Sequence, residues 1–214
     1  MEGNDDPLNT LLSVSLPRLL NATSEYHSLA CSSCSAEEIQ LLGELSRRIK
    51  QCDFLLRNVG VFEQRQFSNA LGILGSVVGK QQDADAQFEA SCQELDVIRL
   101  LTETFYWVAH RVNTVVVANH ASLRGKRLPE LPKKLKTGGV TNVRNHLLEH
   151  PFEYSETFGL GGMWRGPVLN GGVGQDSNGN QVEDSGLFFN AIEWAETITE
   201  TLLTASEKLK KVAM

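Results

Sequence analysis

LDVIRLLTETFYWVAHRVNTVVVA, residues 95–118, is the stretch that decides the fold. Apolar side chains recur in it with a 3–4 alternation over three heptads, the period of a helix in an antiparallel bundle. The seam consists of Leu95, Ile98, Thr102, Phe105, Ala109, Val112 and Val116. Its apolar face is widened by Trp107, Val108, Val115 and Val117. We therefore expect the central helix of an all-α bundle, from about Asp83 to Asn119.

A polar row runs beside this seam. Its members are spaced by three, four and three residues, so they face the same way on a helix: Glu103, Tyr106, His110 and Asn113. A solvated helix face is the simpler interpretation. The alternative is one wall of a site whose other wall is the segment 141–150, and in that site His110 and Tyr106 would contact a substrate.

Further helices are predicted on both sides of the central one. Ser35 and Glu38 form a capping box that begins a helix, which should end near Asn58–Gly60. Others are expected from Glu63 to Val78 and from about Gly186 to Val212. The apolar stripe of the first is Ile39, Leu42, Leu45, Ile49, Cys52 and Leu56. The inward side of the last is Leu187, Phe188, Ile192, Ala195, Ile198, Leu202 and Leu209.

The chain has the length and composition of one ordinary globular domain, with 214 residues, 41% of them hydrophobic. Residues 1–34 are predicted to be an N-terminal helix, which Pro17 interrupts or ends, and a polar linker that begins at Thr23. Residues 35–214 form the helical bundle domain. Within it, residues 152–185 are a glycine-rich insertion before the last helix, and Asn178–Gly179 signals a hairpin there.

Composition argues against several other classes. No apolar run approaches the roughly 20 residues that span a bilayer, and the acidic N-terminus lacks the layout of a signal peptide. We expect a cytoplasmic protein with no membrane partner. The lone Cys31-x-x-Cys34 lacks the second ligand pair of a zinc ribbon, so neither a metal nor another cofactor is expected.

Positive charge is concentrated in one predicted loop. The window from Ser122 to Asn145 contains one acidic residue, Glu130, and seven basic ones: Arg124, Lys126, Arg127, Lys133, Lys134, Lys136 and Arg144. The window carries +6 (7 − 1), so the rest of this chain of net charge −6 carries −12. Such a loop is suited to bind a polyanion, and a solvated connector is the simpler alternative.

Residues 141–150, TNVRNHLLEH, carry the densest chemistry of the chain. Thr141 is a suitable N-cap for a short helix. Pro151 cannot continue that helix normally, which places His150 near its C-terminal end. The question is whether this polar turn is catalytic.

Arg144, Asn145 and His150 form an Arg–Asn–x4–His pattern. In this pattern the chain resembles the HEPN superfamily, whose members carry an arginine, a polar residue and then a histidine in a small helical bundle. The resemblance covers the motif and the coarse helix pattern. It implies metal-independent RNA cleavage by a homodimer without a cofactor, and it leaves open an inhibitory protein partner. The chain departs from many members in having Pro151 where a tyrosine follows the histidine.

These residue types suit such chemistry. Imidazole titrates near neutrality, so His150 can transfer a proton, and the guanidinium of Arg144 matches two phosphate oxygens. Asn145 would orient either His150 or Arg144. The residues expected to bind substrate are His146, His110, Tyr106, Arg124, Lys126, Arg127, Lys133 and Lys134. Arg144 and His150 lie roughly 120° apart on a helix, so a long arginine, a frayed helix end or a dimer must bring them together.

Two other interpretations stay open. His146-x-x-Glu149-His150 has the spacing of a zinc hydrolase motif, in which two histidines share a helical face and the glutamate acts as base. Alternatively, the stretch is a polar helix end in a non-catalytic helical protein that binds a partner.

Overall fold

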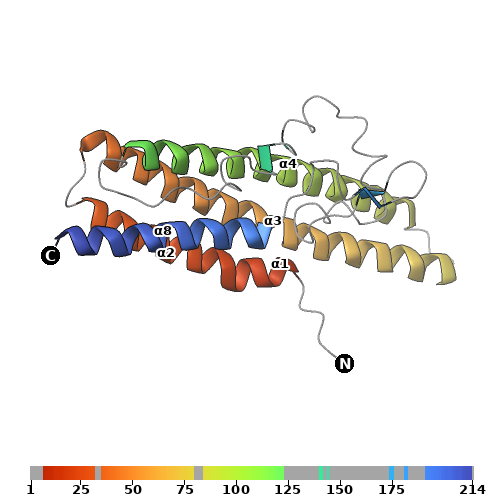
Figure 1. The fold of residues 1–214 in the computed structure, drawn as a ribbon. Coiled ribbons are helices and arrows are strands. Elements are labelled where there is room, and N and C mark those ends of the chain that lie inside the picture. The colour runs from red at the N-terminus through yellow and green to blue at the C-terminus, as the bar shows by residue number, and fades with distance from the viewer. Residues whose placement is uncertain are drawn as a thin grey trace.

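The computed structural model describes residues 7–31, 35–79, 84–122, 140–141, 144, 174–175, 181–182 and 191–213. It confirms the all-α fold class, with four long helices packed against each other (Figure 1). These helices are α2 (Leu16–Cys31), α3 (Ala36–Gly79), α4 (Ala84–Ser122) and α8 (Ala191–Ala213). The short α1 (Pro7–Thr10) and the π-helix η1 (Leu11–Ser15) precede α2.

The N-terminal segment is helical further than the sequence predicts. The prediction that Thr23–Cys31 belongs to a polar linker is wrong, because α2 continues to Cys31 and buries Tyr26 and Ala30. Pro17 does not end the helix. The N–H of Leu16 donates to the carbonyl of Leu11, five residues back, and this π turn lets the chain stay helical up to and through the proline.

Helix α3 begins where the capping box predicts, with the N–H of Ile39 donating to the Ser35 carbonyl at 3.0 Å. The predicted break at Asn58–Gly60 is wrong, because α3 is one helix of 44 residues that includes both predicted helices. The Asn58 amide donates to the Phe54 carbonyl at 2.7 Å within the helix, and Val59 beside Gly60 is buried. Burial of this apolar side outweighs the weak helix propensity of asparagine and glycine.

Helix α4 confirms the predicted central helix, with buried Phe105, Ala109, Val112 and Val116 along its seam. Helix α8 begins at Ala191, and Ala195, Ile198, Leu202 and Leu209 are buried as predicted, while Leu187 and Phe188 lie outside the described residues. In the insertion, β1 (Gly174–Gln175) pairs antiparallel with β2 (Gln181–Val182), which confirms the hairpin signal.

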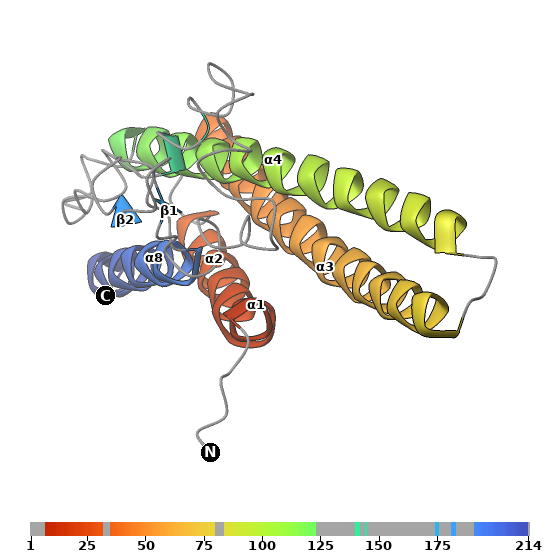
Figure 2. The same ribbon diagram turned by 90° about the vertical axis from the view of Figure 1, so that its right-hand side faces the viewer.

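The molecule has two parts, which we call the base and the arm. In the base, one hydrophobic core joins α2, α8, α3 up to Leu56 and α4 from Phe105 onward. The arm is the far end of the α3–α4 hairpin, residues 61–79 and 84–100, and it extends beyond α2 and α8 as a pair of helices (Figures 1 and 2).

Polar groups inside the base are paired across helices. The indole Nε1 of Trp194 on α8 donates to Asn113 Oδ1 on α4 at 2.8 Å, and the hydroxyl of Tyr26 on α2 donates to Asn119 Oδ1 at 2.9 Å. Phe105 packs edge-on against Trp194, with the ring centroids 6.0 Å apart. These contacts fix the register of α2 and α8 on α4.

Candidate functional site

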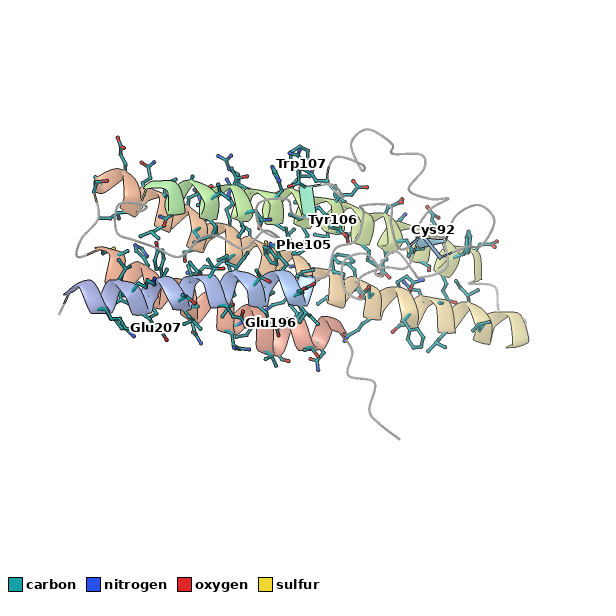
Figure 3. All side chains as sticks on the ribbon, in the orientation of Figure 1. Cys92, Phe105, Tyr106, Trp107, Glu196 and Glu207 are labelled. Atoms are coloured by element: carbon teal, nitrogen blue, oxygen red, sulfur yellow. The ribbon has the colours of Figure 1, made fainter. Side chains whose placement is uncertain are left out.

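The outer side of α4 in the base carries the candidate site. Trp107, His110 and Arg111 lie within about one turn of each other, so they share this side. Trp107 is 47% exposed and points away from the bundle, whereas its neighbour Phe105 points into the core (Figure 3).

A second segment brings the predicted motif to this side. Val140, Thr141 and Arg144 have helical backbone, and Val140 is buried in the core of the base. The prediction that Thr141 is the N-cap is wrong, since Val140 before it is already helical. The Thr141 hydroxyl instead forms a hydrogen bond with His110 Nδ1 at 3.0 Å. Val140 therefore anchors the segment, and Thr141 links it to α4.

Arg144 lies over the indole ring of Trp107, with its guanidinium carbon 5.1 Å from the ring centroid. This is a cation–π contact, and it holds the charge of Arg144 against α4. Arg144 and His110 were predicted from separate parts of the chain to serve one site. The structure brings them together.

The electrostatics of the site favour a neutral imidazole. Partial burial lowers the pKa of His110, and the positive charges of Arg144 and Arg111 lower it further. A neutral His110 can accept a proton, and Thr141 can hold its Nδ1 while Nε2 is left for another partner. A negative ligand beside Arg144 would raise the pKa of His110 again, because it would offset the arginine charges.

The polar row of α4 is not a solvated face. Tyr106 and Asn113 are both buried, at 1% and 5% exposed, and Asn113 is bonded to Trp194. Glu103 and His110 are half-buried. Tyr106 points toward the interior rather than toward Trp107 (Figure 3), so its predicted role in binding a substrate is not supported by its position. Buried and half-buried positions therefore alternate along the row.

An open groove between α3 and α4 begins next to the site. It is lined by Arg111 of α4 and by α3 residues Glu37, Gln40, Leu41, Gly43, Glu44 and Arg47. Arg47 also lines a neighbouring depression with Lys50 and His27, which extends the basic surface around α3. In this region Glu44 forms ion pairs with Arg47 and Arg48, which offset part of the positive charge.

Several predicted site residues lie outside the described residues. They are Asn145, His146, His150, Arg124, Lys126, Arg127, Lys133 and Lys134. The predicted zinc motif also lies there. In the described ranges, no three histidine, cysteine or acidic side chains gather as a metal ion would require. Burial raises the pKa of the Cys52 thiol, which packs in the core.

No family model matches the chain, and neither does any curated protein or solved structure. None of the helices in the described part of the chain is long and apolar enough to cross a membrane. Function must therefore be argued from the site itself.

The sequence-based prediction missed three residues of this site. It assigned Trp107 to the apolar face, Thr141 to a helix cap, and Arg111 to no role. One signal was available for two of them, because Trp107 lies about one helical turn before His110 and Arg111, which are adjacent in the sequence. The contact to Thr141 joins residues 31 apart in the sequence, and no local pattern indicates it.

Proposed function

We propose that the chain is an RNA-binding protein whose phosphate-contacting centre is Arg144 with His110. The observation that carries this proposal is that Arg144, the first residue of the Arg–Asn–x4–His motif, is held over Trp107 on the same side of α4 as His110. Two segments far apart in sequence thus place a permanent cation beside an imidazole with a lowered pKa.

This arrangement suits a phosphodiester. A guanidinium offers paired N–H donors to two phosphate oxygens, and Trp107 orients it through the ring face. Arg111 also lines the groove that continues along the bundle, and its guanidinium would give a nucleic acid backbone a further cationic contact. The basic residues of segment 124–136 precede the motif in the sequence and add positive charge to this part of the chain.

The same centre has groups for metal-independent cleavage, as the resemblance to the HEPN superfamily implies. An imidazole removes the proton of the 2′-hydroxyl, and the oxygen attacks phosphorus as the bond to the 5′-oxygen breaks. The leaving 5′-oxygen takes a proton from a general acid, the role we propose for His150. Arg144 stabilises the extra negative charge on phosphorus. We propose His150 for proton transfer and Asn145 for orientation, with neutral His110 as the imidazole held on α4.

Binding is the first property to test. Fluorescence anisotropy with labelled single-stranded RNA should show that Arg144→Gln weakens binding by about tenfold or more. The matched control is Arg65→Gln, because Arg65 makes the same kind of contact in the arm, 5.2 Å from the Phe62 ring centroid. Equal effects of the two substitutions would contradict a site at Arg144.

Cleavage is tested on the same RNA in EDTA. We expect wild-type protein to cleave, His150→Ala to lose cleavage, and His110→Gln to lower the rate while RNA binding stays within a few-fold. Binding without any cleavage would limit the proposal to RNA binding. Activity that appears only with added zinc would favour the motif His146-x-x-Glu149-His150 instead.

A helical protein that binds a partner remains the second candidate. The observation in its favour lies in the arm, where apolar side chains are more than half exposed. That surface is far from Arg144 along α4, so the two functions do not exclude each other.

A further inference from the structure

One side of the arm carries large apolar side chains that are exposed. On α3 they are Phe67, Leu71 and Leu74, which are 62%, 52% and 64% exposed. On α4 they are Phe88 and Leu95, which are 62% and 40% exposed. The spacing of 4 and 3 residues on α3, and of 7 on α4, makes each set a single stripe along its helix. We call these five residues the arm face.

The arm face continues the surface that α2 and α8 cover in the base. Phe67 and Leu74 follow Ile49 and Leu56 by 18 residues, which is about five turns of one continuous helix. Ile49 and Leu56 are fully buried in the core. The same stripe therefore enters the core at one end of α3 and is exposed at the other.

The apolar stripe of α4 is likewise exposed in the arm and lies on a side that is buried in the base. Phe88 and Leu95 precede Tyr106 and Asn113 by 18 residues, again about five turns. Tyr106 and Asn113 are buried, and Asn113 accepts a hydrogen bond from Trp194 of α8. Both stripes thus lie on the side of the hairpin that α8 covers in the base.

None of the other described helices covers this side in the arm. Helices α2 and α8 lie beside the base half of the hairpin, and the paired helices of the arm extend past them (Figures 1 and 2). A continuous apolar patch of a few hundred Å² is about as large as the largest patch on a typical monomer, and such a patch is often an interaction surface.

We propose that the arm face is a homodimer interface, in which the arms of two copies pack into a four-helix bundle. In this assembly the second copy covers the arm face, as α2 and α8 cover the same side of the hairpin in the base. A two-fold axis brings the same surface of each copy together, so the apolar side chains of one arm face meet those of the other. The inference is independent of the proposed RNA site.

The area is sufficient for a dimer. With ordinary side-chain areas, the five residues of the arm face expose on the order of 500 Å² per copy. Pairing two copies would bury on the order of 1,000 Å² from these side chains alone, which reaches the size of a specific interface before flanking residues are counted.

The charge distribution favours a second copy over a nucleic acid. Residues 66–79 of α3 contain no charged side chain, so two α3 helices can meet at the centre of the assembly without burying a charge. The acidic side chains Asp85, Glu89 and Asp96 are exposed on α4, where they would repel RNA. Small residues beside the stripe, including Ser68 and Ala70, let another helix approach closely.

The test is sedimentation equilibrium of the full chain from about 1 to about 100 µM. We expect wild-type protein to reach the mass of a dimer. Leu74→Glu places a charge in the interface, so it should raise the dissociation constant by roughly 100-fold or more. Leu74 is more than half exposed in one copy, so this variant should keep its helical circular dichroism.

The matched control is Leu100→Glu. Leu100 is 62% exposed on the same helix as Leu95, but five residues further along, so it lies roughly 140° around α4 from the arm face. Its dissociation constant should stay within about threefold of wild type. A monomeric wild type at every concentration overturns the proposal. So does a dimer that Leu74→Glu leaves intact, or one that Leu100→Glu weakens equally.

Discussion

The base and the arm are built from the same two helices and differ in what covers them. Ile49 is fully buried, whereas Phe67, about five turns further along the same side of α3, is 62% exposed. Both are large apolar side chains in the same stripe. Burial of this stripe therefore depends on the presence of α2 and α8, which end beside the base.

The contacts between α3 and α4 also change from base to arm. In the arm, polar side chains join the two helices: Asn69 donates to Glu94 at 2.9 Å and Gln66 to Ser91 at 3.4 Å. In the base, the same helices meet through the hydrophobic core. The arm therefore holds two helices in register with less buried apolar surface, and it should be the first part to open.

The largest expected effect on the free energy of unfolding comes from comparing a core residue of the base with an exposed residue of the arm. Phe105→Ala in the base removes a fully buried ring and should lower the free energy of unfolding by about 3–5 kcal/mol. Phe88→Ala in the arm should cost less than about 1 kcal/mol in the monomer, because that ring is mostly exposed. Urea unfolding well below the dissociation constant of any dimer measures both. Equal losses would contradict the division into base and arm.

A second pair of substitutions compares buried and exposed hydrogen bonds. Asn113→Ala leaves the buried Nε1 of Trp194 without its acceptor and should cost about 1–3 kcal/mol. Asn69→Ala leaves Glu94 to be hydrated, so its cost should be below about 1 kcal/mol. The same unfolding assay applies. A larger loss from Asn69 would mean that Glu94 is less accessible to water than its position suggests.

Glycine substitutions compare the base and the arm through smaller changes in the free energy of unfolding. Gly43→Ala in the base should stabilise the protein by about 0.5–1 kcal/mol, since a methyl group there meets nothing within 4 Å and alanine favours helix. Gly72→Ala in the arm should gain less, because the new Cβ would lie 3.0 Å from the Gln87 side-chain oxygen, which has to move. Thermal unfolding would reveal the order, and a loss at Gly43 would argue against a helix there.

The smallest effect concerns pH. The pKa of His110 is lower in the folded state than in the unfolded one, so the unfolded chain takes up the proton more readily as pH falls. The contribution of neutral His110 is fully present above the unfolded pKa and is lost as pH falls through that value toward the folded one. His110→Gln cannot take up this proton, so its midpoint should fall about 1–2 °C less between pH 7.5 and 5.5. A larger fall in the variant would contradict the direction of the shift.

Much of the fold was predictable from local pattern. The seam of α4 and the start of α3 at Ser35 follow from side-chain period and capping, which act within a few residues. The predicted break at Asn58–Gly60 and the linker at Thr23–Cys31 failed for one reason. Packing against neighbouring helices stabilised segments whose composition alone favours loops.

The candidate site was predictable only in pieces. Arg144 and His110 were both predicted by residue type and spacing, but their proximity was one of two open interpretations. Trp107 received no site role, because a tryptophan in an apolar stretch is usually buried. Its exposure follows from the orientation of α4, which the contacts of Phe105 and Asn113 with Trp194 determine on the opposite side.

Local sequence patterns are enough to predict a helical bundle with a long central helix, a late hairpin signal and one arginine–histidine motif. Those properties depend on periods and caps that each segment carries locally. Tertiary packing determines that α3 is one helix, that the arm lacks the cover of the base, and that Arg144 lies over Trp107 beside His110. Each of these depends on which surfaces meet, and contacts between residues distant in sequence leave no local pattern.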